Sequence, residues 1–298
     1  MNIIGYGYVG KSIGALLERN DIMYQVNDPL PKNGSFIYYA PDNISNMIHY
    51  SESCLNKDTR NYYFICVPTP SEDYTGKCNT SIVFSVVKEL IKHCKAPTTI
   101  IVKSTISPGT LTQLDLLIEK SNTETDLSIV FCPEFLRESY CIEDTLNSSY
   151  AIFGIPTNDP INKKVSLELE TMYKNTLYPF NPNFKVYVRS STICELFKYT
   201  INVHLAVKVW YFNEINEICE KMNVPYSQLQ SLFELDPRLG KTHTDVPGHD
   251  GKYGFGLGCL PKETKSLTFL QKELNIPNDI LKEITKRNES YFRRKSIA

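Results

Sequence analysis

The strongest constraint on the fold lies at the start of the sequence, where residues 5–10 read Gly-Tyr-Gly-Tyr-Val-Gly. A short strand-like run, Asn2–Ile4, precedes this motif, and a helix-forming stretch, Lys11–Arg19, follows it. Glycines at these places allow a tight turn and let a pyrophosphate approach backbone N–H groups at a helix N-terminus. A second strand-like run ends in Asp28, where a carboxylate would accept hydrogen bonds from a ribose hydroxyl. We therefore expect a dinucleotide site, and the acid favours NAD over NADP, whose 2′-phosphate it would repel.

The remainder of the first half also alternates between strand-like and helical stretches. Several strand-like runs are almost continuously apolar, as in parallel strands that are covered on both faces. Strands that alternate with helices predict βαβ units, so the expected fold class is α/β with an N-terminal Rossmann-type parallel sheet. The stretch Pro29–Asn43 is expected to be a loop. The predicted strands are Asn2–Ile4, Tyr24–Asn27, Tyr62–Val67, Thr99–Lys103, Ser128–Phe131, Tyr150–Phe153 and Lys185–Val188.

The pattern changes near residue 190, where a long helical stretch begins. Thr192 to Glu195 reads as a capping box, with a hydroxyl at the N-cap and a carboxylate three residues later. No Pro or Gly interrupts the sequence from there to about Asn223. We expect residues 1–190 to form the NAD-binding domain and residues 191–298 an all-helical central domain whose long helix supports a homodimer. The expected apolar face of this helix comprises Leu196, Tyr199, Val203, Ala206, Val207 and Trp210.

Composition excludes several other classes of protein. Lys and Arg total 32 against 33 Asp and Glu, which argues against a general nucleic-acid binder. No run of about 20 apolar residues is present, so no membrane span is expected. The nine cysteines occur singly and the start lacks a secretory signal, so we expect free thiols in the cytoplasm. These isolated cysteines and five scattered histidines give no metal-ligand spacing, and no metal is expected.

A second unusual stretch, Gly254 to Glu263, carries a cysteine after three closely spaced glycines. Glycines there let the backbone pass close to a bound molecule. Pro and Lys after Cys259 suggest a helix start, whose dipole together with Lys262 would lower the pKa of the thiol. An NAD site together with an activated cysteine suggests oxidation through a thiohemiacetal and a thioester. The competing interpretation is a buried structural cysteine.

Two pairs of polar residues fit the same chemistry. Glu134 and Glu138 lie four residues apart after a predicted strand, and Lys198 and Asn202 lie four apart on one face of the long helix. An ammonium and an amide aimed at one point could stabilise a developing alkoxide. Taken alone, each pair is more simply a surface feature: a capping acid in the first case and a solvated Lys/Asn pair in the second.

Taken in order along the chain, these segments resemble the UDP-glucose/GDP-mannose dehydrogenase family. The resemblance covers nearly the whole sequence, which makes it far more specific than any one motif. It rests on Gly5–Gly10, Val67–Pro70, Lys103–Thr105, Pro108–Thr110, Pro133–Glu138, Glu195–Lys198 with Asn202, Asn213–Glu214, Asp236–Gly240 and Gly254–Glu263.

The resemblance implies an enzyme that oxidises the C6 alcohol of a nucleotide sugar to a carboxylate in two NAD-dependent steps. By analogy, Cys259 would be the nucleophile, and Lys198 and Asn202 would stabilise charge on the C6 oxygen. Glu134 would assist proton transfer and thioester hydrolysis, and Thr105 and Glu263 would hold or activate the water. UDP-glucose is the favoured substrate, with GDP-mannose and a UDP-N-acetylhexosamine left open.

The resemblance also implies two binding sets, with Arg238 reaching the substrate of the partner subunit. The NAD set is Gly5, Gly7, Tyr8, Val9, Gly10, Asp28, Val67, Pro68, Thr69, Ser104, Thr105 and Glu138. The substrate set is Glu134, Phe135, Leu136, Arg137, Glu138, Lys198, Asn202, Arg238, Tyr253, Phe255 and Gly256.

The sequence departs from the family pattern in three places. Leu257 replaces the second of two adjacent glycines, and Glu263 stands where the family usually has Asp. The family also carries a C-terminal nucleotide-binding domain that lies beyond this sequence, which is either a short form or a piece of a longer protein. Two alternatives to the full reaction stay open: a relative that binds NAD or a partner with little turnover, and a one-step alcohol or hydroxyacid dehydrogenase.

Overall fold

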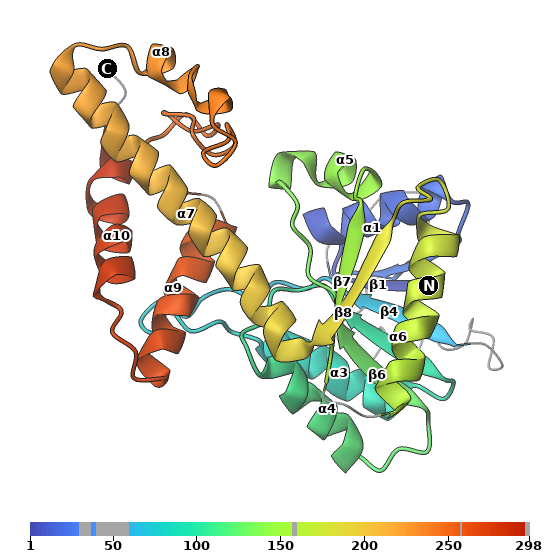
Figure 1. Cartoon of the computed structure of the whole chain (residues 1–298). Helices are drawn as coiled ribbons and strands as arrows, with labels where there is room; N and C mark the ends of the chain where they lie inside the picture. Colours follow the sequence, from blue (N-terminus) through green and yellow to red (C-terminus); the bar gives the residue numbers. More distant parts are fainter. Residues whose placement is uncertain (30–36, 40–59, 157–159, 257, 296–298) are drawn as a thin grey trace. The chain divides into compact units, whose positions relative to one another are not determined.

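A computed structural model describes residues 1–29, 37–39, 60–156, 160–256 and 258–295 (Figure 1). The chain divides into two compact units, and each unit is built from two separate stretches of the sequence. The first unit comprises Met1–Thr69 and Asn79–Lys198, and the second comprises Pro70–Cys78 and Tyr199–Ala298. This division falls at Lys198, inside the long helix, whereas the sequence patterns change at residue 190. The domain boundary expected from the sequence stays a prediction.

The first unit is built on one eight-stranded sheet with the order β3-β2-β1-β4-β5-β6-β7-β8. All neighbouring strands run parallel except β6 and β7, which are antiparallel through the pair Phe131–Gly154. The α/β class and the seven predicted strands are confirmed, with ends that differ by one or two residues. The strands are β1 (Asn2–Ile4), β2 (Gln25–Asn27), β3 (Ile37–Tyr39), β4 (Asn61–Ile65), β5 (Thr98–Val102), β6 (Leu127–Phe131), β7 (Tyr150–Ile155) and β8 (Lys185–Ser190).

Two details of the sheet correct the expectations. β3 lies inside the stretch Pro29–Asn43 that was expected to be a loop, whose residues 30–36 and 40–43 lie outside the described residues. Its three residues, Ile-Tyr-Tyr, have high β-propensity and pair with β2 at the edge of the sheet, a short signal that the surrounding Pro, Asn and Gly residues obscured. The antiparallel pair of β6 and β7 also departs from the fully parallel sheet that was expected.

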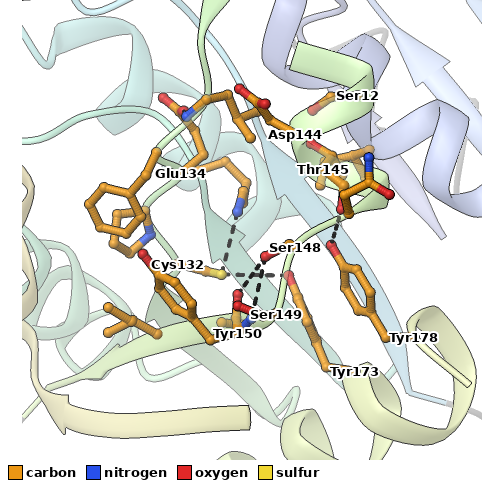
Figure 2. A pocket seen from close by; sticks show the side chains of 18 residues that line it. Ser12, Cys132, Glu134, Asp144, Thr145, Ser148, Ser149, Tyr150, Tyr173 and Tyr178 are labelled. Carbon is orange, nitrogen blue, oxygen red and sulfur yellow. Dashed lines mark hydrogen bonds between the residues drawn. The ribbon is translucent and has the colours of Figure 1, made fainter. Parts of the chain in front are cut away.

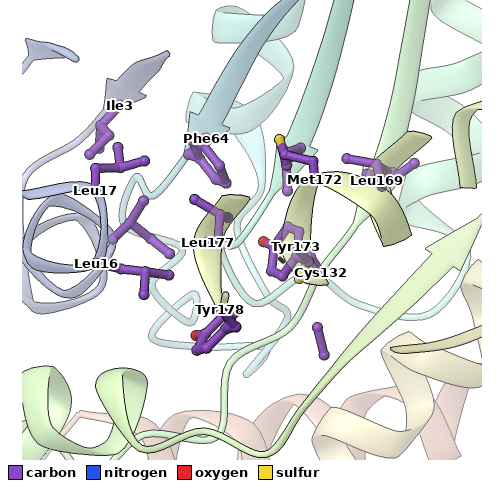
Figure 3. Packing of buried hydrophobic residues seen from close by; sticks show 14 of the residues in the cluster. Ile3, Leu16, Leu17, Phe64, Cys132, Leu169, Met172, Tyr173, Leu177 and Tyr178 are labelled. Atoms are coloured by element: carbon purple, nitrogen blue, oxygen red, sulfur yellow. Dashed lines mark hydrogen bonds between the residues drawn. The ribbon is translucent and has the colours of Figure 1, made fainter. Parts of the chain in front are cut away.

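Helices cover both faces of the sheet. One face packs against α1 (Tyr8–Arg19) and α6 (Pro160–Met172), and Figure 3 shows Ile3 and Phe64 of this face near Leu16, Leu17 and Leu169. The opposite face packs against α3 (Ser81–His93) and α4 (Thr110–Lys120). Because side chains alternate along a strand, buried strands with apolar residues at most positions supply both cores. The unit also contains η1 (Glu138–Tyr140), α5 (Cys141–Leu146) and the π-helical η2 (Tyr173–Leu177).

The second unit is helical apart from an isolated bridge between Ser71 and Cys78, as far as its described residues show. Its longest helix, α7 (Ser191–Met222), begins in the first unit and confirms the predicted long helix. Of its predicted apolar face, Tyr199, Val203 and Ala206 are buried, whereas Leu196 is exposed. The remaining elements are α8 (Tyr226–Gln230), η3 (Phe233–Leu235), α9 (Cys259–Glu273), α10 (Asp279–Ser290) and η4 (Phe292–Arg294).

The capping box predicted for α7 is wrong, because Thr192 lies within the helix rather than before it. The carboxylate of Glu195 instead accepts hydrogen bonds from the backbone N–H groups of Gly109 (2.6 Å) and Leu111 (2.8 Å). These groups stand at the start of α4, where the first N–H groups of a helix have no partner within the helix. Glu195 therefore stabilises the N-terminus of a different helix.

Substitution of Glu195 by glutamine is expected to change how stability depends on pH. Burial raises the pKa of Glu195 from 4.5 to about 7, although the two N–H groups oppose this shift. The folded state thus holds this proton more tightly than the unfolded state does. The contribution of Glu195 to the free energy of unfolding is therefore greatest below pH 4.5 and is lost as pH rises through 7. Between these limits the free energy of unfolding of the native chain should fall by roughly 3 kcal/mol more than that of Glu195→Gln. Urea titrations across this range check the prediction, and parallel slopes would contradict it.

Candidate active site

The glycine motif forms the turn between β1 and α1. Gly5 has a positive φ of 87°, and a Cβ there would lie 2.7 Å from the backbone oxygen of Cys66. A Cβ at Gly10 would lie 2.1 Å from the backbone oxygen of Gly5. Gly7 is different, since nothing lies within 4 Å of the Cβ position at the N-cap of α1. The turn thus leaves open space in front of the helix N-terminus, and the residues present fit a dinucleotide pyrophosphate.

Asp28 follows the end of β2 and is buried. Its Oδ2 accepts a hydrogen bond of 2.6 Å from the backbone N–H of Tyr6, within the glycine turn. The acid predicted to contact a ribose therefore also anchors the turn that would bind the pyrophosphate.

Two loops at the carboxyl ends of β4 and β5 hold the next predicted NAD residues. Ser104 Oγ donates to the backbone oxygen of Val67 (2.7 Å), and Thr69 Oγ1 donates to the backbone oxygen of Thr105 (2.7 Å). These bonds join the two loops at the edge where ligands bind in parallel α/β sheets. Pro68 is exposed beside them.

A buried ion pair lies after β6 in the same unit. Lys198 Nζ lies 3.3 Å from Glu134 Oε1 and also donates to the backbone oxygen of Glu134. Glu134 Oε2 accepts the N–H of Leu136 (2.8 Å), and the ring of Phe135 lies 5.3 Å from Lys198 Nζ. The exposed fractions of the Lys198 and Glu134 side chains are only 3% and 6%. The structure thus brings together the two residues that were predicted to stabilise charge and move a proton.

The other predicted residues of this loop are nearer solvent. Arg137 forms an exposed ion pair with Asp144, and Glu138 is exposed at the start of η1. The contacts of these two residues with substrate or NAD stay predictions.

The second unit holds the predicted nucleophile. Cys259 is the first residue of α9, which confirms the predicted helix start, and it is partly exposed. One turn later Glu263 is fully buried, with Lys262 Nζ 3.9 Å from its Oε1. Asn202 is buried on α7, one turn after Lys198. Leu257, the departure in the glycine segment, lies outside the described residues.

The loop before Cys259 is fixed by amide side chains that the sequence did not single out for this role. Asn213 Oδ1 accepts the N–H of Gly254 (2.9 Å), and Asn288 bonds both the N–H and the carbonyl oxygen of Phe255 (2.8 Å each). The Phe255 side chain is buried in the unit's core. A Cβ at Gly256 would lie 2.4 Å from the guanidinium of Arg293, so any larger residue there would displace this side chain.

Two further members of the predicted substrate set lie in the same unit. Lys295 Nζ lies 4.6 Å from the centre of the Tyr253 ring, in a cation–π contact. Arg238 is largely exposed and donates from Nε to Asp236 Oδ1 (2.9 Å), and this bond raises the pKa of the guanidinium. The substrate contacts expected of Tyr253 and Arg238 stay predictions.

A pocket in the first unit brings Glu134 together with residues to which the sequence patterns gave no individual role. Figure 2 shows Cys132, Glu134, Tyr173 and Tyr178 around it, and Lys103 also lines it. Strand register is the signal that could have found Lys103, because it stands one residue beyond β5 and beside Cys132, one residue beyond β6. The described residues contain no group of three or more His, Cys, Asp or Glu side chains able to hold a metal.

Comparison with known proteins decides the family. Residues 44–176 match the NAD binding domain of the UDP-glucose/GDP-mannose dehydrogenase family, and residues 192–290 match its central domain. The chain belongs to the UDP-glucose/GDP-mannose dehydrogenase family. The resemblance read from the sequence is confirmed, and the first unit carries this family's NAD-binding domain. The glycine motif at residues 5–10 precedes the matched range.

Relatives within the dehydrogenase family have low sequence identity to this chain but align over most of its length. The chain is 30% identical over 238 residues to the UDP-glucose 6-dehydrogenase of Rhizobium meliloti. This alignment covers 79% of this chain and 52% of that protein. A UDP-glucose dehydrogenase structure from Pyrobaculum islandicum matches with a TM-score of 0.75 at 21% identity, over 97% of this chain and 67% of that one. A GDP-mannose dehydrogenase structure from Pseudomonas aeruginosa matches with a TM-score of 0.65 at 23% identity, over 97% and 68%. The chain thus spans about half the length of the Rhizobium relative, and the two structures establish the fold.

Proposed function

We propose that this chain carries the NAD-dependent oxidoreductase part of a nucleotide-sugar 6-dehydrogenase, with UDP-glucose as the favoured substrate. Family membership supports the reaction class. The observation that carries the proposal is the buried pair of Lys198 and Glu134 at the carboxyl edge of the sheet that holds the glycine turn. A buried ammonium next to a carboxylate suits an alcohol that must lose a proton as it is oxidised.

NAD would be held by the glycine turn and Asp28, and when bound it supplies the hydride acceptor. Lys198 and Asn202, one turn apart on α7, would stabilise negative charge on the C6 oxygen. Glu134 would accept the proton of the C6 alcohol. The loop Phe135–Glu138 together with Tyr253, Phe255 and Gly256 would border the nucleotide sugar, and Arg238 would reach the substrate of the partner subunit.

The second oxidation requires a covalent step on this chain. The thiolate of Cys259 would add to the C6 aldehyde and form a thiohemiacetal, whose oxidation gives a thioester. Thr105 and Glu263 would position a water whose attack on the thioester releases the carboxylate and restores the thiol. Because this chemistry requires a reduced Cys259, a reducing compartment such as the cytoplasm suits the protein. None of the described helices has the length and apolarity needed to cross a membrane.

The experiment that tests this function is a complete progress curve of NADH with NAD and UDP-glucose. Two NADH per sugar would support oxidation to the carboxylate. One NADH per sugar would favour a one-step dehydrogenase. No NADH with UDP-glucose, GDP-mannose or UDP-N-acetylmannosamine, in protein that still binds NAD, would favour a binding protein with little turnover.

Removal of the charge of Asp28 is expected to weaken cofactor selection. Asp28→Asn keeps an oxygen for the N–H of Tyr6, so the glycine turn stays anchored while the carboxylate is lost. The preference for NAD over NADP should fall about tenfold, since a charged acceptor at the ribose is removed. Titration of each cofactor measures the two dissociation constants. Unchanged selectivity in a folded variant would place Asp28 away from the ribose.

A homodimer through α7 is also proposed. Ile193, Phe197, Tyr211, Ile218 and Met222 are exposed and lie at spacings of four, seven or fourteen residues, which place them along one stripe of the helix. Ile218→Glu should shift the mass in solution from dimer to monomer, whereas Lys282→Glu on α10 should leave it unchanged. Light scattering after size-exclusion chromatography measures this mass. A native monomer would contradict the proposed dimer.

A further inference from the structure

Three reactive side chains form one row at the carboxyl edge of the sheet. Ile65, Val102 and Phe131 are paired across β4, β5 and β6, and each is followed by one member of the row. The row is Cys66, Lys103 and Cys132. Neighbouring residues of a parallel register point to the same face of the sheet. Lys103 therefore lies between two thiols.

The contacts in this row favour one of the two thiols. Lys103 Nζ donates to Cys132 Sγ at 3.4 Å, and the hydroxyl of Tyr173 lies 3.5 Å from the same sulfur (Figure 2). The exposed fractions of Lys103, Cys132 and Tyr173 are 7%, 1% and 3%. No carboxylate of the described residues forms an ion pair with Lys103. A buried ammonium is costly unless negative charge lies near it, so negative charge that develops on Sγ would be stabilised there.

The hydroxyl of Tyr173 is a second hydrogen-bond partner of this sulfur. Burial, with a further contribution from the charge of Cys132, raises the pKa of Tyr173 well above its usual value. Its hydroxyl therefore keeps its proton and can donate to Sγ. A cation and a neutral donor thus converge on one sulfur, an arrangement that stabilises a thiolate.

The cluster is not sealed within the core. Cys132, Lys103 and Tyr173 all line the pocket that also contains Glu134 and Tyr178. This pocket is therefore the route by which a small neutral molecule would reach the sulfur, since Cys132 itself is only 1% exposed.

We propose that Cys132 is a second reactive thiol of this chain and a site of oxidation by hydrogen peroxide to a sulfenic acid. The thiolate sulfur attacks one peroxide oxygen, so that an S–O bond forms and the O–O bond breaks. The sulfur loses two electrons, and the second oxygen leaves as hydroxide and takes up a proton to become water. Overall, one thiol and one hydrogen peroxide give one sulfenic acid and one water.

Cys66 provides a contrast within the same row. Burial raises the pKa of the Cys66 thiol to about 12, although the charge of Lys103 opposes this, so it stays protonated and unreactive. Strands lie about 4.8 Å apart, which puts the backbones of Cys66 and Cys132 about 9–10 Å apart. This separation exceeds the limit of about 7 Å for a disulfide. The sulfenic acid should therefore persist rather than be converted into a bond with Cys66.

The test treats the full chain with hydrogen peroxide and dimedone, which labels sulfenic acids, and follows each cysteine by peptide mass spectrometry. Cys132 should be labelled about tenfold faster than Cys219, a matched buried thiol among Phe212, Tyr226 and Phe233. Lys103→Met should slow labelling of Cys132 about tenfold, and Lys103→Arg should restore most of the rate. Equal labelling of Cys132 and Cys219 in the native chain would overturn the proposal.

Folding of the variants is checked by circular dichroism. Unchanged labelling of Cys132 in folded Lys103→Met would also overturn the proposal. If that variant does not fold, Tyr173→Phe replaces it, and a rate equal to that of the native chain would count against the site. Because labelling does not depend on NADH production, failure here is distinguishable from failure of the proposed function.

Discussion

Replacement of Cys259 by serine is expected to reduce steady NADH production from UDP-glucose by on the order of 10³-fold or more. A serine hydroxyl at the start of α9 is much less acidic than a thiol, so it is a poor nucleophile toward the aldehyde. The affinity for NAD should stay within about twofold, because Cys259 belongs to the second unit whereas the glycine turn and Asp28 belong to the first. Steady-state rates and NAD titrations on the same preparation measure both quantities.

Cys141→Ser is the matched control for this substitution. Cys141 is likewise partly exposed and likewise the first residue of a helix, α5, but it has no assigned role. Its variant should retain native turnover. Native turnover in Cys259→Ser would remove the covalent step from the mechanism, and loss of NAD binding in that variant would indicate a structural defect instead.

The central sheet could be predicted from the sequence because its buried parallel strands consist almost entirely of apolar, β-branched and aromatic residues. Thr98–Val102 is buried at every position and Asn61–Ile65 at all but one, so both stand out without any partner being known. β3 was missed because its strand-forming run, Ile-Tyr-Tyr, is only three residues long and lies among Pro, Asn and Gly residues. The antiparallel step between β6 and β7 is likewise a property of the chain path and leaves no mark on composition.

Prediction of the site succeeded where spacing along one element determines geometry. Lys198 and Asn202 could be placed on one face of α7 because four residues make about one helical turn. The capping role of Glu195 could not be inferred, since its partners Gly109 and Leu111 lie 86 and 84 residues away. Asn213 and Asn288 position the loop before Cys259 through similarly distant contacts. Such roles depend on which elements meet in three dimensions.

Loss of the Lys198 ammonium should affect both stability and turnover. Lys198→Met leaves the buried Glu134 carboxylate with its bond from the N–H of Leu136 but without its cation. Removal of one partner from a buried pair costs about 3–5 kcal/mol of unfolding free energy. The proposed stabilisation of the C6 oxygen is lost as well, so kcat should fall by roughly 10²–10³-fold.

A double-mutant cycle separates these two effects of Lys198. Glu134→Gln combined with Lys198→Met removes the unpaired charge, so the double variant should recover most of the lost stability yet remain inactive. Lys174→Met is the matched control, because Lys174 forms an exposed pair with Glu170 at 2.6 Å and such pairs contribute at most about 0.5 kcal/mol. Denaturant titrations and initial rates on the native chain, Lys198→Met, Glu134→Gln and the double variant give the coupling. If the double variant were no more stable than Lys198→Met, the destabilisation would come from lost packing along α7 rather than from an uncompensated carboxylate. If Lys198→Met kept native turnover, the charge on the C6 oxygen would have to be stabilised by other groups.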